Sequence, residues 1–331
     1  MKQRDYSLDV IKIISCLLVV LMHTLRRYDQ SVELHPFLYY LTRCSMPLFF
    51  MASGAVQLCK EKIDYRYCFK KIWNIVILMV AYYVADIIFR FVYNMEFTPS
   101  GAIVALKGAY GDYAVFWFLR TMIMIYLVLP LLHKIYTAKP ILLTIVLGLS
   151  CFLLDAYNVG GILFFDHTAY IEAPVNPQYR LWVWLFYYIL GGIIYKNYKR
   201  FGGATFMWCI LAMITTKVAV FYMYYILHYK TNIVNGGFGY TSIFMALWVS
   251  CTMIFILKID FSKWKNVVGI CSATLLPMFA LHAFIIGCYD QALFADSSSM
   301  QIVGYILIVF TTFIMSFCIT RVPLLKFFYK I

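Results

Sequence analysis

A lysine and a histidine occupy one face of the first long apolar segment. Lys12 and His23 are eleven residues apart, and eleven steps of 100° return a helix to within about 20° of the same face after three turns. At a rise of 1.5 Å per residue, the two side chains lie roughly 16 Å apart along the axis. A cation suits a phosphate and a neutral imidazole suits a general base, although a lone histidine in a helix is more often structural.

Ionisable side chains also interrupt the other apolar segments. In hydrocarbon each costs about 3 kcal/mol or more unless it faces a partner or a water-filled cavity. Arg43, Arg120, Lys217 and His282 lie well inside predicted helices. With the N-terminus in the cytoplasm, all four fall in the outer half of the membrane. Their clustering predicts a polar cavity there.

Simpler structural roles explain some of the remaining intramembrane charges. Asp86 and Arg90 are four residues apart, which is the spacing of an ion pair on one helix face. Asp9 and Lys12 are three apart and could form a similar pair at the inner end of the first helix. Snorkelling from a helix end suits Arg90 and Arg180.

The elements that must position these residues are apolar helices. Of the 331 residues, 63% are hydrophobic and 13% are charged, whereas soluble domains are roughly 45–50% apolar and about 25% charged. With about 20 apolar residues in each span, the chain has room for roughly ten crossings and for no separate catalytic domain. The sequence therefore predicts an all-α, polytopic, multi-pass protein of the cell membrane that forms a single domain over residues 1–331. Its helices are expected near residues 8–25, 37–58, 72–93, 113–133, 141–157, 180–195, 204–224, 239–257, 268–288 and 301–320.

Basic residues set the orientation of these helices. With both termini in the cytoplasm, most Lys and Arg residues fall in inner loops, and the outer loops keep Arg26, Arg27, Lys107 and Lys230. This asymmetry follows the positive-inside rule, so the net charge of +13 needs no nucleic-acid partner. Acidic residues are mostly outside, and Asp155, near the end of the fifth helix, is counted with them.

The ten cysteines are scattered singly and lie nearly all within apolar runs. They form neither a C-x-x-C pair nor a Cys/His cluster at metal spacing. We therefore expect small core residues rather than disulfides or metal ligands.

Two segments between the helices are candidates for substrate-facing elements. The longest loop runs from Tyr157 to Tyr179 and carries two glycines and two prolines. It is the better candidate for a lid. Residues 99–110 are a candidate re-entrant or interfacial segment.

Several motifs in a fixed order resemble those of the acyltransferase 3 family. The first helix carries Leu8-Asp9-x-x-Lys12 followed by His23, similar to the family's L-D-x-x-R motif with a histidine after ten intervening residues. The second helix carries PLFFMASG over residues 47–54, which resembles P-L-F-F-x-x-S-G. The other similarities, which extend over nearly the whole chain, are Phe116-Trp117-Phe118-Leu119 with Tyr126 and Pro130, YYILGG over residues 187–192, and Leu281-His282.

The resemblance implies an integral membrane O-acyltransferase. Members of this family move an acyl group, usually acetyl, from cytoplasmic acyl-CoA to a hydroxyl of a cell-surface or lipid-linked glycan. Acetyl-CoA is then a donor substrate, and no cofactor or metal is expected to be bound permanently. The pattern looks most similar to stand-alone members such as the enterobacterial-common-antigen O-acetyltransferase. Expected partners are acyl-CoA, a glycan or lipid-linked sugar acceptor and membrane lipid, with no nucleic acid.

The resemblance assigns donor binding to basic residues at the cytoplasmic face, namely Lys12, Arg66, Lys70 and Lys71. Two departures from the family pattern affect this assignment. Lys12 stands where the family has arginine, so the charge is kept but the bidentate fork is lost. The family's R-x-x-R segment appears only as KKIWN over residues 70–74, and ordinary positive-inside charge explains Lys70 and Lys71 equally well.

The resemblance also suggests how the transfer is catalysed. His23 would take the proton from the acceptor hydroxyl as general base. Arg43, Arg120 or Ser53 would donate hydrogen bonds to the oxyanion, and the sequence does not rank these three. His282 would orient His23 or bind the acceptor. A covalent acyl-histidine step is compatible with the motif but is not required.

A transporter or flippase of a small polar or lipid-linked substrate is the alternative interpretation. Many spans with intramembrane charges also describe transport. Common transporter folds carry paired broken helices in two repeats, and the sequence lacks a matching pair of Gly/Pro-interrupted segments. An enzyme would acylate a glycan in detergent without any gradient, whereas a transporter would not.

Overall fold

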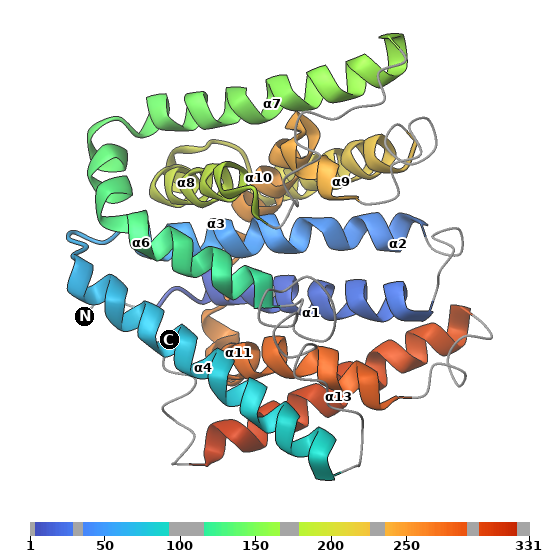
Figure 1. The fold of residues 1–331 in the computed structure, drawn as a ribbon. Coiled ribbons are helices and arrows are strands. Elements are labelled where there is room, and N and C mark those ends of the chain that lie inside the picture. Colours follow the sequence, from blue (N-terminus) through green and yellow to red (C-terminus); the bar gives the residue numbers. More distant parts are fainter. Residues whose placement is uncertain are drawn as a thin grey trace. The chain divides into compact units, whose positions relative to one another are not determined.

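Helices make up all the regular structure in the part of the chain that the computed structural model describes, which is residues 4–28, 36–92, 116–165, 179–225, 236–289 and 298–322 (Figure 1). The chain divides into two compact units. Unit 1 contains residues 1–61 and 131–272, and unit 2 contains residues 62–130 and 273–331. Two long helices, α6 (Trp117–Ala138) and α11 (Lys265–Cys288), contribute residues to both units.

Unit 1 is built around a central pair of helices. Its main helices are α1 (Tyr6–Tyr28), α3 (Ser45–Leu58), α7 (Pro140–Phe165), α8 (Leu181–Asn197), α9 (Thr205–Phe221) and α10 (Ile243–Leu257). Helix α3 packs against α1 and α8, while α7 packs on α8, and α10 contacts α1, α8 and α9. Figure 1 shows this layering, with α7 and α1 in the outer layers of the unit. Helices α3 and α8 therefore form the interior of unit 1.

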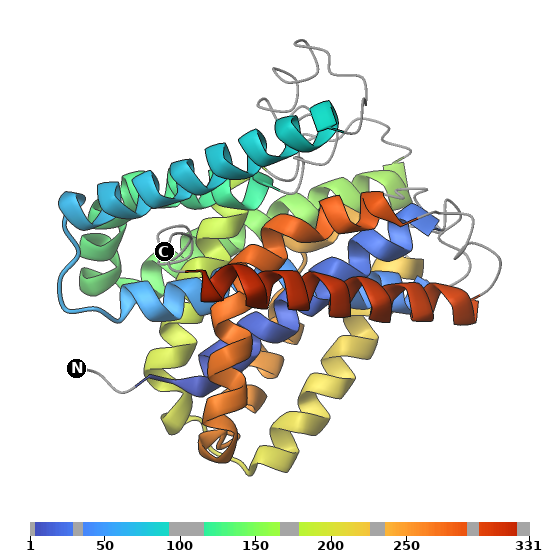
Figure 2. The same ribbon diagram turned by 90° about the horizontal axis from the view of Figure 1, so that it is seen from below.

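Unit 2 joins two long helices to segments of α6 and α11. The long helices are α4 (Tyr65–Val92) and α13 (Ser298–Arg321), and Figure 2 shows both as uninterrupted. The Phe118 and Phe279 rings meet edge to face with centroids 5.4 Å apart, which connects α6 to α11. Tyr289 and Thr311 share a hydrogen bond of 2.8 Å between their hydroxyl oxygens, which connects the end of α11 to α13.

Every one of the ten predicted helices has a helical counterpart. Seven of the described helices are long and apolar enough to cross a membrane by length and composition. The other three predictions, over 37–58, 180–195 and 239–257, correspond to shorter pieces. They are α2 (Pro36–Leu41) with the 3₁₀ turn η1 (Thr42–Cys44) and α3, then α8, then the 3₁₀ segment η6 (Gly236–Thr241) with α10.

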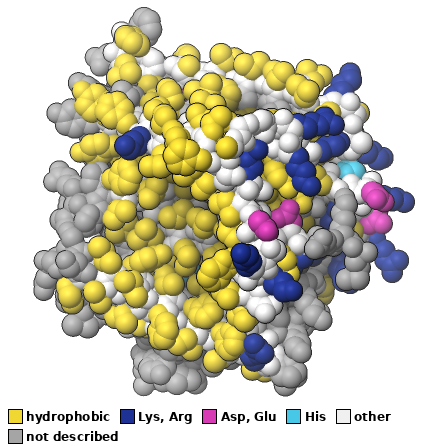
Figure 3. Space-filling model, turned by 180° about the vertical axis from the view of Figure 1, so that it is seen from behind, with side chains coloured by type: hydrophobic (Ala, Val, Ile, Leu, Met, Phe, Trp, Pro, Cys, Tyr) yellow, Lys and Arg dark blue, Asp and Glu magenta, His cyan; other side chains and the backbone are white. Residues whose placement is uncertain are grey.

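The predicted fold class is thereby confirmed as an all-helical, polytopic, integral membrane protein. Large apolar side chains are exposed along α7, α9 and α13, where a soluble protein would bury them. Figure 3 shows apolar side chains over much of one face. Lipid is the solvent that such a surface requires. The cytoplasmic placement of both termini stays a prediction.

The fifth predicted helix is longer than expected. The sequence predicts a helix over 141–157 followed by a loop, but α7 runs from Pro140 to Phe165. The glycines at 160 and 161 do not end it, because an apolar run follows at once and a glycine inside a helix costs only about 1 kcal/mol. Asp155, expected near the outer end of this helix, therefore lies well inside it. The rest of the candidate lid, residues 166–178, and the candidate segment 99–110 lie outside the described residues.

Helices α3 and α8 cross in close contact at two glycines. A Cβ placed on Gly54 would overlap the backbone carbonyl of Tyr188, and one placed on Gly191 would overlap the carbonyl of Met51. Small residues allow helix backbones to approach in this way within a membrane. The crossing therefore depends on glycine at both positions and fixes the position of Ser53, which lies next to it.

Candidate functional site

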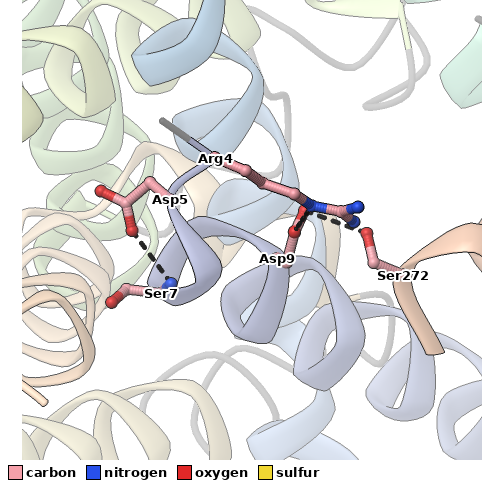
Figure 4. Close-up of polar contacts among 5 residues, drawn as sticks. All are labelled: Arg4, Asp5, Ser7, Asp9 and Ser272. Atoms are coloured by element: carbon pink, nitrogen blue, oxygen red, sulfur yellow. Dashed lines mark hydrogen bonds and ion pairs between the residues drawn. The ribbon is translucent and has the colours of Figure 1, made fainter. Parts of the chain in front are cut away.

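The first turn of α1 carries a carboxylate, Asp9, that is paired with an arginine. Arg4 Nε lies 2.5 Å from Asp9 Oδ2, and Ser272 Oγ donates to Asp9 Oδ1 at 2.9 Å (Figure 4). The predicted ion pair between Asp9 and Lys12 is wrong, because Arg4, from the chain just before α1, takes that place. Both oxygens of Asp9 are thus engaged by groups other than Lys12.

Lys12 is left as a cation without a carboxylate partner at ion-pair distance among the described residues. Its side chain is half-buried. An ammonium group carries three hydrogen-bond donors, and no ion pair with a described carboxylate uses them here. It is therefore suited to bind an anionic ligand.

The face of α1 that carries Lys12 and His23 is closed in its middle and accessible at its ends. We call Lys12, Cys16, Val19 and His23 the α1 stripe; their spacing of four, three and four residues keeps them on one face. Cys16 is 0% exposed and Val19 is 2% exposed, whereas Lys12 and His23 are half-buried. The two chemical groups of the stripe thus lie on either side of a packed apolar segment.

Arg43 lies in the 3₁₀ turn η1, between α2 and α3, and is surrounded by tyrosines. Its Nη2 donates to the hydroxyl of Tyr39, and the guanidinium carbon lies 4.4 Å from the centroid of the same ring. The Arg43 side chain also hydrogen bonds to the side chain of Tyr240. We call these three residues the Arg43 cluster.

The guanidinium group of Arg43 keeps at least one hydrogen-bond donor that the described residues do not use. No carboxylate is at ion-pair distance from it in the described part of the chain. Its Nε is buried and has no hydrogen-bond partner among those residues. Tyrosine faces and hydroxyls stabilise a buried cation only in part. The group can therefore still donate to a carbonyl or oxyanion.

The Arg43 cluster forms where two predicted helices break. The sequence predicts continuous helices over 37–58 and 239–257, but the structure contains the 3₁₀ segments η1 and η6 in these stretches. Arg43 belongs to η1 and Tyr240 belongs to η6. At membrane depth, backbone that departs from the α-helix is tolerated where protein or a cavity covers it. Such breaks often mark functional positions.

Sequence reasoning missed a carboxylate in unit 1. Asp155, on α7, accepts a hydrogen bond from the Tyr222 hydroxyl at 2.7 Å and one from Thr241 Oγ1 at 3.3 Å. Tyr222 directly follows α9 and Thr241 ends η6, so Asp155 connects three elements. The signal was available, because an aspartate stands amid the apolar run CFLLDAYNVGGILFF.

Three predicted catalytic residues lie on contacting elements of unit 1. His23 is on α1, Arg43 is on η1 and Ser53 is on α3, and each of these elements contacts the other two. Ser53 is half-buried. The elements therefore bring an imidazole, a guanidinium and a hydroxyl into one unit.

The other two predicted catalytic residues belong to unit 2. His282, on α11, is 0% exposed, and its Nδ1 lies 2.7 Å from the carbonyl oxygen of Phe279. A carbonyl can only accept, so Nδ1 carries the proton and Nε2 carries the lone pair. Arg120, near the start of α6, is half-buried. Within unit 2, His282 is held in one tautomer by its own helix.

The predicted donor-binding residues Arg66, Lys70 and Lys71 lie in the first two turns of α4, also in unit 2. Arg66 and Lys70 are exposed and Lys71 is half-buried. Lys71 Nζ lies 5.7 Å from the centroid of the Tyr67 ring. These cations are accessible to an anion in solution.

Two intramembrane cations differ from the sequence-based expectations. Arg180, expected to snorkel, is 2% exposed, because it begins α8 inside unit 1. Lys217, expected to line a polar cavity, is exposed on α9. The helical run continues beyond α9 through Tyr225, in agreement with the predicted span 204–224. The side chains of Asp86 and Arg90 lie outside the described residues.

The described residues contain no cluster of three or more His, Cys, Asp or Glu side chains that could hold a metal ion. Every cysteine in the chain is free in the structure.

Comparison with known proteins adds a family match. The acyltransferase domain family, acyltransferase 3, matches residues 5–321. This match extends from α1 to α13 and includes both units. No curated protein and no solved structure matches the chain.

Proposed function

The chain belongs to the acyltransferase 3 family, and we propose on this premise that it transfers an acetyl or other acyl group from cytoplasmic acyl-CoA to a hydroxyl of a cell-surface or lipid-linked glycan. The family makes it a membrane acyltransferase. The donor, the acceptor and the roles of individual residues are our proposal. We treat residues 1–331 as a single functional domain.

The α1 stripe is the observation that carries this proposal. An unpaired ammonium group lies near one end of a membrane helix and an imidazole lies eleven residues further along the same face. Acyl-CoA has an anionic nucleotide end and a thioester separated by a thin pantetheine arm. A cation and a base about 16 Å apart along a helix fit two ends of such a donor.

Donor binding is assigned to Lys12. Lys12, in unit 1, would bind a phosphate of the donor from the cytoplasm, and the assignment of Arg66, Lys70 and Lys71, in unit 2, to donor binding stays a prediction of the sequence. Lys12 is especially suited to this role because Asp9, its nearest acidic neighbour in sequence, is neutralised by Arg4. The thioester would reach His23 along α1 once the neighbours of Cys16 and Val19 separate, because these two residues are fully packed in the structure.

His23 is assigned as the general base. The acceptor oxygen attacks the thioester carbonyl while neutral His23 takes the hydroxyl proton. Collapse of the tetrahedral intermediate breaks the C–S bond and forms the ester, and the leaving thiolate of CoA receives a proton. The transfer involves no oxidation or reduction. Donor and acceptor alone account for every atom of the products, the ester and free CoA.

Arg43 is the preferred donor to the oxyanion. Its element contacts α1, its Nε is buried without a partner among the described residues, and tyrosines fix its guanidinium. A preorganised donor of this kind is worth about 3 kcal/mol in acyl transfer. Ser53, on α3 of the same unit, is a further candidate for this role. The roles that the sequence suggests for Arg120 and His282, which lie in unit 2, stay predictions.

A transporter or flippase is the second candidate function. The breaks at η1 and η6 favour it, because transporters bind their substrates at discontinuous helices. The two functions differ in what they need. Acyl transfer requires a donor but no sealed membrane, whereas transport requires two compartments.

The test uses purified protein in detergent with acetyl-CoA and a membrane glycolipid fraction. Release of the CoA thiol, together with a base-labile acetyl ester on the glycan by mass spectrometry, is the expected result. The alternative result is that both products are absent and that a polar or lipid-linked solute moves after the protein is reconstituted into vesicles. That result would overturn acyl transfer in favour of transport. Surface glycans from cells with and without the protein should differ by the same ester.

A further inference from the structure

A chain of hydrogen bonds in unit 1 leads from α7 to the Arg43 cluster. It begins at Asp155, whose two carboxylate oxygens accept from Tyr222 and Thr241 (2.7 and 3.3 Å). A carboxylate in an otherwise apolar, lipid-exposed helix is costly. Charge-assisted bonds to two hydroxyls offset part of that cost. Their effect is to tie η6 and the end of α9 to α7.

The η6 segment is held at both of its last two residues. Thr241 is bound by Asp155, and the carbonyl of the preceding residue, Tyr240, accepts a 2.7 Å bond from the Tyr187 hydroxyl. The Trp184 ring packs against Tyr240 with centroids 5.1 Å apart. All these side chains are buried or, for Asp155, half-buried. The backbone of a short 3₁₀ segment is therefore fixed from α7 and α8.

Tyr240 transmits this position to Arg43. Its backbone is fixed by α8 and its neighbour Thr241 by α7, while its side chain hydrogen bonds to the guanidinium of Arg43. Tyr39 holds the guanidinium from its own segment of chain. A planar guanidinium acts through directional bonds, so its orientation decides which atoms it can reach.

We propose that Asp155 and Thr241 are positioning residues for the reaction, which fix η6 so that Tyr240 holds Arg43 in the orientation that stabilises the oxyanion. The inference rests on the proposed role of Arg43. A displacement of about 1 Å can lower turnover by up to roughly a hundredfold. Neither residue touches the reacting atoms, and neither belongs to the sequence motifs of the family resemblance.

Activity of matched variants tests the proposal. Thr241→Val keeps the shape of the side chain but removes the donor to Asp155, whereas Thr241→Ser keeps the hydroxyl. Thr215→Val is the control, because it removes a threonine hydroxyl that bonds to Leu211 and Ala212 within α9 and to Cys251 of α10, and to no described residue of η6 or of the Arg43 cluster. We expect kcat to fall on the order of tenfold in Thr241→Val with KM for acetyl-CoA unchanged. Thr241→Ser should recover most of the turnover, and the control should match the wild type.

A spectroscopic measurement tests positioning without any catalysis. In protein labelled with ¹⁵N-arginine, the Nε–H signal of Arg43 is assigned by its loss in Arg43→Lys. We expect this signal to shift or broaden in Thr241→Val and in Asp155→Asn, and to stay in place in Thr241→Ser and Thr215→Val. Asp155→Asn also serves as the second variant should Thr241→Val fail to fold.

The outcomes separate this inference from the proposed function. If the wild type turns over and Thr241→Val has normal kcat and an unmoved Arg43 signal, the positioning role is overturned while the function stands. A raised KM with unchanged kcat also overturns it, because ground-state binding would then be affected. If the wild type has no transferase activity, the proposed function fails and the role in turnover fails with it. The Arg43 signal then reports the structural link alone.

Discussion

His23 is the residue on which the proposed chemistry depends most. Its Ala variant should lose acyl transfer by at least a hundredfold, because general base catalysis contributes 10²–10⁴-fold. The measurement is CoA thiol release in detergent, with size-exclusion elution and thermal midpoint as controls for folding. Cys16→Ala, two stripe positions away on the same face and fully buried, is the matched variant that should keep activity. A His23→Ala protein with near wild-type turnover would remove the assigned base.

Lys12 provides a residue-scale test of donor binding. Lys12→Met keeps the length of the side chain but removes the charge, so KM for acetyl-CoA should rise by about tenfold while kcat changes little. Lys12→Arg should match or improve the wild-type KM, because it restores the bidentate fork. Lys139→Met, at an exposed position between α6 and α7, is the charge-matched control. A change in kcat alone would contradict a donor-binding role.

At the scale of elements, the crossing of α3 and α8 makes a stability prediction. Gly54→Ala and Gly191→Ala each place a methyl group on backbone atoms of the other helix, so the helices must separate. We expect each to destabilise the protein by about 1–3 kcal/mol. Gly160→Ala, within α7 and with no atom near the added methyl, should be neutral or slightly stabilising.

The measurement for these three variants is the thermal midpoint in one detergent. A lower midpoint for the two crossing variants and an unchanged or higher one for Gly160→Ala is the expected pattern. Equal midpoints for all three would show that α3 and α8 do not approach as closely as the glycine positions require.

The helices could be predicted from sequence, but the breaks that form the Arg43 cluster could not. Apolar composition and length identify each helix, because lipid requires every backbone group to be bonded internally. The residues around Arg43 are as apolar as those of a regular helix, so nothing in LTRCSMPLFF signals η1. Tyr240 and Asp155 reach the cluster through tertiary contacts that no local pattern encodes. Asp155 was counted with the outer acidic residues because it lies near the end of the predicted helix, whereas α7 continues for ten residues beyond Asp155, to Phe165.

The spacing argument for α1 was more successful than the ion-pair argument. Lys12 and His23 lie on the same face of α1, as helical periodicity alone predicts, and both side chains are half-buried. The partner of Asp9 is Arg4. Arg4 lies before the helix, so helical spacing could not predict this pair. Of the sequence-predicted catalytic residues, His23, Arg43 and Ser53 lie on contacting elements, and their roles stay predictions.

At the scale of the whole molecule, the orientation in the membrane is testable with introduced cysteines. Phe37→Cys, near the start of α2, should react with an impermeant thiol reagent on intact cells, because that end is predicted to be outside. Lys199→Cys, in the turn η4 (Tyr198–Arg200) after α8, should react only after permeabilisation. Both positions are exposed, and labelling of the unaltered chain gives the background from its own cysteines. The reverse pattern would invert the topology and move the donor-binding cations to the wrong side for cytoplasmic acyl-CoA.

The packed middle of the α1 stripe has a consequence for cell energetics. An enzyme that takes its donor from one compartment and its acceptor from the other could let protons and ions leak across the membrane. The thiol of Cys16 and the isopropyl group of Val19 occupy the gap between the two accessible groups, so a file of water cannot form along this face while the helices stay closed. On this face of α1 the structure therefore leaves no continuous path for water between Lys12 and His23.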